Sequence, residues 1–263
     1  MTTGLSYAGT VAGTTSYITQ IATMAVVEET NAEFLKILPQ MITYAENRMY
    51  RDIDFMFTST SLHGVSFVLT PGNRNLSFDI NLSLNTDAQS GTFVVSEQIN
   101  LLTDANGNAS ATTNPDACLR VPLVPTTKEF LDAVYGSSLS ANLGKPKYFV
   151  PFNETLFFVG PVPDQAYPVE VVGTYRPNSL SGTNTTTFIS QYLPDLFIMA
   201  SMIYISAYQR NFGRANDDPQ MAVTYESQYQ ALLKGAMVEE ARKKFEASGW
   251  SSQSPTPVAT PTR

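Results

Sequence analysis

The stretch from position 31 to position 53 decides the fold class, and it reads Asn-Ala-Glu-Phe-Leu-Lys-Ile-Leu-Pro-Gln-Met-Ile-Thr-Tyr-Ala-Glu-Asn-Arg-Met-Tyr-Arg-Asp-Ile. Asn31 is a favoured N-cap residue, and Pro39 predicts either a second helix or a kink because it has no N–H to donate. Beyond Pro39, apolar residues recur every three or four positions, which predicts one side of a helix. They are Ile42, Ala45, Met49 and Ile53, with Glu46, Asn47, Arg48, Arg51 and Asp52 mostly on the other side. We therefore expect helical structure over residues 17–55.

A second helical block is predicted after residue 186. Residues 186–212 are apolar nearly all round a helix, which favours a buried central position, and Pro194 falls near the start, where proline is tolerated. Asn211-Phe-Gly is typical of a helix end, and Asp217-Asp-Pro opens a last helix that continues to about residue 247. Its apolar side is predicted to carry Tyr225, Tyr229, Leu232, Leu233, Ala236 and Phe245, and its negative end Arg242, Lys243 and Lys244.

Residues 57–175, between these blocks, are poor in charge and rich in turns. Short stretches of β-branched and aromatic residues predict strands at 65–69, 76–82 and 156–160. Turns are predicted at 71–72, 106–107 and 163–164. We expect a hairpin over 152–175 that turns at 161–164, and a short helix over 128–135. The pattern favours an antiparallel sheet over a series of strands with crossover helices.

The sequence therefore predicts an α+β fold: a bundle of N- and C-terminal helices, an inserted antiparallel β-rich domain and an extended C-terminal arm. The expected segments are 1–56 for the N-terminal helices, 57–180 for the β-rich insertion, 181–249 for the C-terminal helices and 250–263 for the arm. At 263 residues the chain is long enough to bury a core without a disulfide or metal.

The arm, residues 250–263, reads Trp-Ser-Ser-Gln-Ser-Pro-Thr-Pro-Val-Ala-Thr-Pro-Thr-Arg. Its prolines favour an extended chain, which reaches roughly 45 Å when fully stretched. One interpretation is a disordered tail. The other starts from Trp250, the only Trp of the chain, which we expect to pack on this chain or on a partner.

Composition excludes several functions. Only 15% of residues are charged and the formal net charge is −7, which argues against a protein that binds nucleic acid through its phosphates. Cys118 and His63 are the only residues of their types, which excludes a Cys/His zinc site, a His-based triad and a disulfide framework within one chain. No cofactor is expected. The sequence shows no secretory signal or membrane-spanning stretch, so we expect a soluble protein made in a cytoplasm.

No stretch has the spacing of a catalytic motif. Residues 104–108, Asp-Ala-Asn-Gly-Asn, resemble the start of a calcium loop, but the Gly stands at the fourth rather than the sixth position and no glutamate follows at the twelfth. We therefore expect a loop between strands. Adjacent acids are expected at helix ends or on a solvated helix, as in Glu28/Glu29, Asp217/Asp218 and Glu239/Glu240. We predict that the chain is not an enzyme.

Several stretches, taken in their order and spacing, resemble the head-to-tail adaptor proteins of tailed bacteriophages, especially the short-tailed type. They are residues 38–52; Gly-Lys-Pro-Lys-Tyr-Phe at 144–149; Pro-Val-Pro-Asp-Gln-Ala-Tyr-Pro-Val-Glu-Val at 161–171; Tyr-Arg-Pro-Asn-Ser-Leu-Ser at 175–181 with threonines at 185–187; and Tyr-Leu-Pro-Asp-Leu-Phe at 192–197. The resemblance covers about residues 17–247. Residues 57–114 match less well and resemble an enlarged β insertion.

The resemblance implies a structural virion protein at the head-to-tail junction. Adaptors of this kind form a homo-oligomeric ring, commonly a dodecamer, that docks under the portal protein and extends the DNA channel toward a tail or nozzle protein. DNA passes through without specific binding, and no membrane is involved. The resemblance also implies that the C-terminal arm binds the portal, through Trp250, Pro255, Pro257, Val258, Pro261 and Arg263.

Two other functions stay open at this point. The first is a phage tail or capsid accessory protein that binds a surface glycan, with aromatic side chains of the β region stacking on sugars. The candidates are Phe149, Phe152, Tyr167 and Tyr175. The second is a cell-wall hydrolase, which requires two carboxylates from separate segments facing one cleft.

Overall fold

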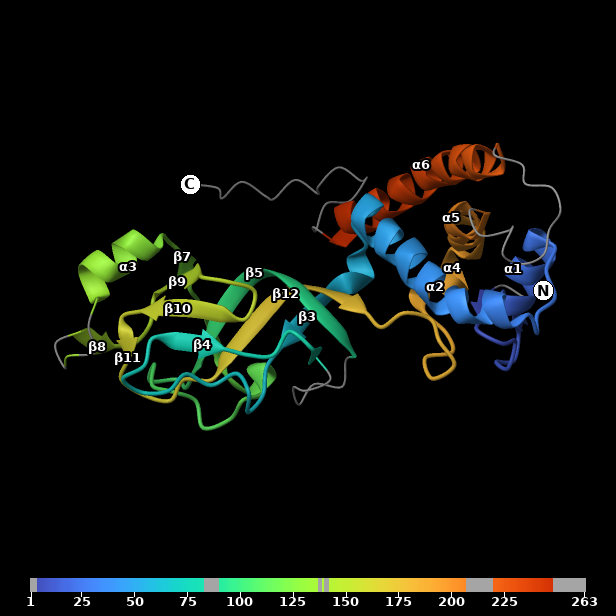
Figure 1. Cartoon of the computed structure of the whole chain (residues 1–263). Coiled ribbons are helices and arrows are strands. Elements are labelled where there is room, and N and C mark those ends of the chain that lie inside the picture. The colour runs from blue at the N-terminus through green and yellow to red at the C-terminus, as the bar shows by residue number, and fades with distance from the viewer. Residues whose placement is uncertain (1–3, 83–89, 137–138, 140–141, 207–219, 248–263) are drawn as a thin grey trace, which may run out of the picture. The chain divides into compact units, whose positions relative to one another are not determined.

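The computed structural model describes residues 4–82, 90–136, 139, 142–206 and 220–247, and confirms an α+β fold with antiparallel sheets (Figure 1). The chain divides into two compact units. Unit 1 comprises Met1–Met56 and Ser179–Arg263, and unit 2 comprises Phe57–Asn178. Unit 1 is therefore built from two separate segments of the chain.

Unit 1 holds most of the helical structure. Its elements are β1 (Gly4–Ser6), β2 (Thr14–Ser16), α1 (Tyr17–Ala25), α2 (Ala32–Asp52), α4 (Phe188–Tyr192), α5 (Pro194–Ser206) and α6 (Met221–Ala247). The short strands β1 and β2 pair in parallel and had no signal in the sequence pattern.

Helix α2 forms from the stretch that decides the fold class. The Asn31 side chain caps it by accepting hydrogen bonds from the N–H groups of Glu33 and Phe34, as predicted. The helix continues through Pro39, so the expected second helix is wrong. The predicted apolar stripe is buried along its whole length. Glu46, however, was assigned to the polar side and is buried with 1% of its surface exposed, because Leu180, Ser179 and Thr187 cover it with hydrogen-bond donors.

The single helix expected over 186–212 is instead two helices, α4 and α5. Thr187 and Ser190 form a capping box at the start of α4. The break falls at Leu193 because a residue before proline avoids helical backbone angles, and Pro194 then opens α5. Residues 207–219, including the predicted helix end at 211–213 and the predicted start at 217–219, lie outside the described residues.

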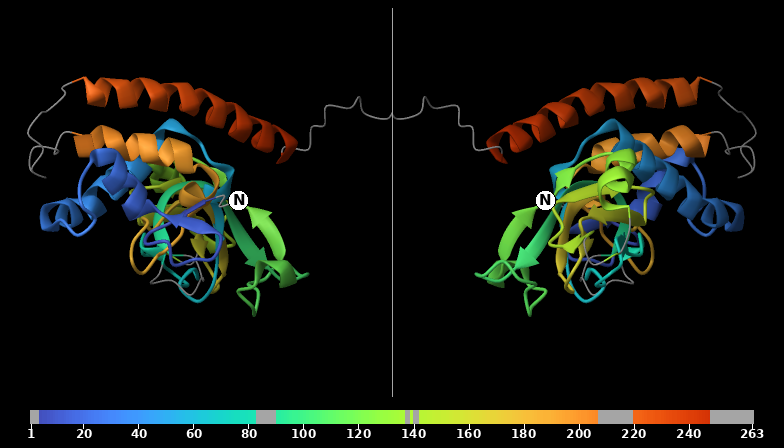
Figure 2. Two further views of the ribbon diagram at one scale, coloured as in Figure 1. Left: turned by 90° about the vertical axis from the view of Figure 1, so that its right-hand side faces the viewer. Right: turned by 90° about the vertical axis from the view of Figure 1, so that its left-hand side faces the viewer.

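Helix α5 forms the centre of unit 1, as its apolar surface predicted. It packs against α1, α2 and α6. The Tyr17 ring stacks on Phe197 at 4.9 Å between centroids, and the Tyr17 hydroxyl bonds the Ser201 hydroxyl at 2.7 Å. In Figures 1 and 2, α5 lies between α6 on one side and α1 with the first turns of α2 on the other.

Helix α6 buries a narrow stripe, formed by the apolar residues Tyr229, Leu233 and Ala236 together with Glu240. Arg48 of α2 donates two hydrogen bonds, of 2.6 and 2.7 Å, to the Glu226 carboxylate of α6. Two residues predicted for its buried side are exposed instead, Leu232 at 36% and Phe245 at 53%. The helix therefore has apolar residues on both sides, and the sequence pattern alone did not separate them.

Unit 2 contains two four-stranded sheets, with strand orders β3-β12-β5-β6 and β4-β10-β9-β7. Every neighbour pair is antiparallel except β7 with β9. The strands are β3 (Ser59–Leu62), β4 (Asn75–Ser77), β5 (Gly91–Thr103), β6 (Leu119–Pro122), β7 (Val124–Pro125), β9 (Tyr148–Pro151), β10 (Leu156–Gly160) and β12 (Val169–Pro177). A parallel pair, β8 (Leu143–Gly144) and β11 (Val162–Pro163), and the helix α3 (Lys128–Tyr135) complete the main elements.

One aromatic cluster forms the centre of the unit 2 core. Phe78 contacts the rings of Phe67, Phe93 and Phe157 at centroid distances of 5.2 to 5.6 Å. Inward side chains of β12, such as Val169 and Val171, belong to the same buried cluster. The core thus draws on strands of both four-stranded sheets.

The hairpin expected over 152–175 is wrong. β10 pairs with β9 and β4, whereas β12 pairs with β3 and β5 in the other sheet. The connection contains Pro161, Pro163 and Pro168, which have no N–H to donate to a continuous ladder, so the chain changes sheets there.

Other expectations for unit 2 had mixed outcomes. The strand at 156–160 and the helix at 128–135 are confirmed. The strand expected at 65–69 is not formed, although Phe67 and Leu69 are buried, and the strand expected at 76–82 ends at Ser77. The stretch at 104–108 is a loop between β5 and β6, as predicted, because the Asp104 carboxylate accepts the N–H groups of Asn106 and Asn108 at 2.8 Å each.

Candidate functional site

Two buried carboxylates anchor the points where the chain leaves and re-enters unit 1. Glu240 of α6, with 4% exposure, accepts the Met56 N–H at 3.1 Å. Glu46 of α2 accepts the Leu180 N–H at 3.2 and 3.3 Å and the Thr187 hydroxyl at 3.4 Å. Both ends of the excursion into unit 2 are therefore tied to helices of unit 1.

The two anchors differ electrostatically. Glu240 also accepts a hydrogen bond from the Lys243 ammonium at 2.8 Å. Glu46 receives hydrogen bonds from the neutral groups of Ser179, Leu180 and Thr187, and burial raises its pKa to about 7 although these bonds act to lower it. Glu46 is thus a buried acid whose charge changes near neutral pH.

A third buried carboxylate, Glu170 of β12, joins all four strands of its sheet. It accepts hydrogen bonds from Ser61 of β3, Asn100 of β5 and Arg120 of β6, at 2.7, 2.8 and 3.0 Å. Burial acts to raise its pKa, but these donors outweigh it and the pKa is lowered. Every partner is a structural neighbour in the sheet, so the arrangement stabilises unit 2.

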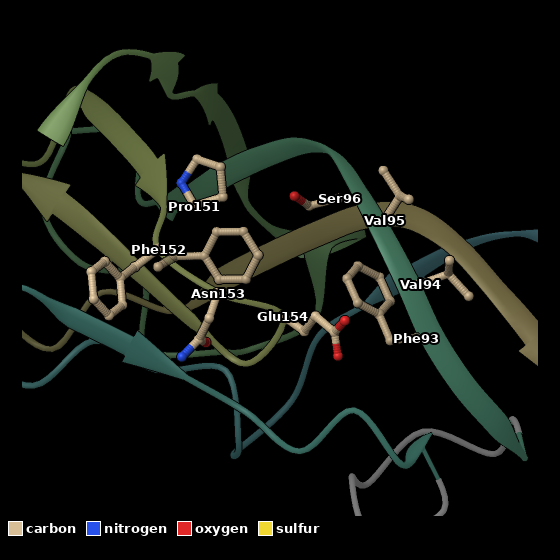
Figure 3. A pocket seen from close by; sticks show the side chains of 9 residues that line it. Phe93, Val94, Val95, Ser96, Pro151, Phe152, Asn153 and Glu154 are labelled. Carbon is tan, nitrogen blue, oxygen red and sulfur yellow. The ribbon is translucent and has the colours of Figure 1, made fainter.

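A shallow, largely apolar pocket of about 390 Å³ lies between β5 and the turn that follows β9 (Figure 3). The buried rings of Phe93 and Phe157 contribute to its lining. Phe152 and Val95, which are 54% and 52% exposed, stand at it from opposite sides. Glu154 is the one charged residue of the lining.

The pocket does not assemble either of the alternative sites. Of the four aromatics proposed to stack on sugars, Phe149 and Tyr167 are buried in the core and Tyr175 packs against it, which leaves Phe152 exposed. A glycosidase needs two facing carboxylates, and the lining contains one. Over the described ranges, no group of three or more His, Cys, Asp or Glu side chains is placed to hold a metal ion.

One face of α6 exposes several large apolar side chains, and sequence reasoning missed it. We define the outer face of α6 as Val223, Lys234, Met237, Val238, Ala241, Arg242 and Phe245, all of them exposed. Its large apolar members are exposed by 68% at Val223, 48% at Met237, 51% at Val238 and 53% at Phe245. The spacing of 234, 238, 241 and 245 places these residues in one row along the helix. This spacing was the signal in the sequence that could have revealed the face.

The predicted portal-binding residues cannot be placed against these surfaces. Trp250, Pro255, Pro257, Val258, Pro261 and Arg263 lie outside the described residues, which end at 247. In the part of the chain that is described, no helix is long and apolar enough to cross a membrane.

Comparison with known families identifies the chain. The model of the SU10 adaptor protein family matches residues 15–258, which include most of both units. A match of this extent defines the class of the protein: it is a structural protein of a bacteriophage virion, and this family is not a class of enzymes. The chain belongs to the SU10 adaptor protein family, and the resemblance to short-tailed phage head-to-tail adaptors is confirmed. No curated protein matches the chain.

Proposed function

We propose that the chain is one subunit of a ring of about twelve copies that docks under the portal and extends the DNA channel toward the tail. Membership of the adaptor family over residues 15–258 is the observation that carries this proposal. The charge content supports it: with 15% charged residues and a net charge of −7, the protein offers little to hold the phosphates of moving DNA.

The C-terminal arm is the portal-binding element in this proposal. It follows α6 in the chain and combines the only Trp of the sequence, Trp250, with prolines that favour an extended segment. The only charged side chain of residues 250–263 is Arg263, so apolar contacts at Trp250, Pro255, Pro257, Val258 and Pro261 supply most of the binding. A tail or nozzle protein binds the ring on the side away from the portal.

The test is a chain that ends at Gly249, mixed with rings of the portal protein from the same phage. We expect the truncated chain to keep the circular dichroism spectrum of the intact protein, because the core residues found in the described part of unit 1 all precede the arm, and to lose at least tenfold in affinity for portal rings. Trp250→Ala should cause most of this loss, and Ser252→Ala in the same arm is the matched control. Undiminished portal binding by the truncated chain would show that the arm is not the docking element.

A further inference from the structure

On the outer face of α6, no described element covers Val223, Met237 or Val238. Four large apolar side chains on it are about half exposed or more, although α6 is the longest described helix. Two cations, Lys234 and Arg242, lie on the same face, and neither forms an ion pair with another described residue. The face is thus apolar with a positive charge at two positions.

A surface of opposite character lies on the other side of α5. We define the α1–α2 corner as residues 26–36, between the end of α1 and the first turns of α2. It exposes two large apolar side chains, Val26 at 69% and Leu35 at 40%. Its exposed charged residues are Glu28, Glu29 and Glu33, with Lys36 as the one cation.

Among the described residues of unit 1, the charges of the two surfaces form no ion pairs. Several other cations are paired, Arg48 with Glu226, Lys243 with Glu239 and Glu240, and Lys244 with Asp54, whereas Arg51 of α2 donates to the Asn47 carbonyl. Glu28, Glu29 and Glu33 contact no cationic side chain among the described residues. The unit thus pairs its charges where helices meet and leaves opposite charges on its two outer sides.

We infer that the outer face of α6 in one copy docks on the α1–α2 corner of a second copy. This inference rests on the proposed ring and names its interface. Val238 and Phe245 cover Val26 and Leu35, while Lys234 and Arg242 face Glu28 and Glu29. Because the two surfaces are different and lie on opposite sides of α5, the contact is heterologous: each copy uses one surface on each neighbour, which closes into a ring when the rotation permits.

A second copy fits this face better than the other partners of an adaptor. The phosphates of DNA would attract the two cations but would repel the acidic corner. They also offer no apolar surface to the half-exposed apolar residues. The corner supplies both complements, carboxylates and apolar side chains, on the same molecule. Steering by opposite charges also fixes which surfaces meet.

Charge reversal with rescue tests the interface, with self-association measured by sedimentation velocity over a range of concentrations. Lys234→Glu with Arg242→Glu places like charges opposite Glu28 and Glu29, and we expect at least tenfold weaker association. Glu28→Lys with Glu29→Lys should weaken it similarly. The four substitutions together exchange the signs, keep the formal net charge of −7 and should restore most of the association.

Matched controls separate a local interaction from net charge. Lys145→Glu with Lys147→Glu, and Glu129→Lys with Glu154→Lys, make the same charge changes in unit 2 and should leave association unchanged. Val238→Asp should weaken association without loss of helical circular dichroism, because Val238 is 51% exposed and outside the core.

Three results would overturn the inference: no self-association of the intact protein, no effect of either reversal, or no recovery in the combined variant. The second and third results leave the proposed function untouched, because it is read separately as binding of the intact chain to portal rings, whereas the first would also count against the proposed ring. Portal binding with unaffected rings would place the ring interface on other residues. Loss of portal binding with rings still sensitive to charge reversal would leave this interface standing and remove the proposed docking role.

Discussion

Glu46 shows how one residue links a helix to the returning chain. Its carboxylate is buried against the Leu180 N–H and two hydroxyl groups, so its charge is held by neutral donors alone. A buried carboxylate without a cation is costly when ionised, which is why its pKa rises to about 7 from the 4.5 of a free glutamate.

This raised pKa predicts a pH dependence of stability. Between about 4.5 and about 7 the folded state holds a proton on Glu46 that the unfolded state has lost, so the contribution of Glu46 is fully present below 4.5 and is lost as pH rises through 7. We expect Glu46→Gln to remove this dependence, a difference on the order of 3 kcal/mol between pH 5 and pH 8. Urea unfolding of both proteins at the two pH values measures it. Glu246→Gln, at an exposed position of α6, is the control, and an equal slope in intact protein and Glu46→Gln would contradict the assignment.

Removing Glu170 should lower the stability of the protein, because its charge is paired. Replacing it by Ala removes the acceptor of Ser61 and Asn100 and leaves the Arg120 guanidinium paired with Asp116 alone, and we expect a loss of about 3 kcal/mol in the unfolding free energy of unit 2. Glu97→Ala removes an exposed carboxylate that accepts one bond from Thr174 in the same sheet, and should cost less than about 1 kcal/mol. Similar losses for the two variants would mean that Glu170 does not hold the four strands together.

At the scale of the element, α2 keeps a proline where helices usually exclude it. Pro39 is exposed inside α2, where it removes one backbone hydrogen bond. We expect Pro39→Ala to stabilise the protein by about 2 kcal/mol, since proline costs roughly 3 kcal/mol relative to alanine in a helix and recovers part of that by restricting the unfolded chain. Pro194→Ala, at the first position of α5, should be neutral or destabilising. Thermal unfolding of the two variants measures both effects, and destabilisation by Pro39→Ala would contradict the prediction.

The elements that the sequence predicted well are those whose pattern is local. Asn31 and the row from Ile42 to Ile53 act within one helix, and α3 is defined by its own short stretch. The predicted hairpin failed because strand pairing depends on partners far away in the chain: β12 bonds to β5, whose residues lie some seventy positions earlier. For α6, apolar residues occur on both sides of the helix, so Phe245 was assigned to the core although it faces outward. The outer face and the roles of Glu46 and Glu170 required the tertiary structure.

At the scale of the whole molecule, the chain enters and leaves unit 2 on neighbouring strands. Ser59, near the start of unit 2, pairs with Thr174, near its end. We propose that residues 57–178 are an inserted domain, and we expect this segment to fold when produced alone. A cooperative thermal transition and a dispersed NMR spectrum of the isolated segment measure this. Unit 1 with residues 57–178 replaced by a short Gly/Ser linker is the complementary protein, and an unfolded 57–178 segment would show that the insertion depends on unit 1.

The central position of α5 imposes an order on biosynthesis. The ribosome makes α1 and α2 first and then all of unit 2, and α5 emerges after both. Until α5 emerges, it cannot cover the apolar stripe of α2. Unit 1 therefore cannot complete its core while the first two-thirds of the chain are translated. Helix α6 is last of all. Because one of the two surfaces of the proposed interface lies on α6, a nascent chain can present both of them only after translation has passed residue 245.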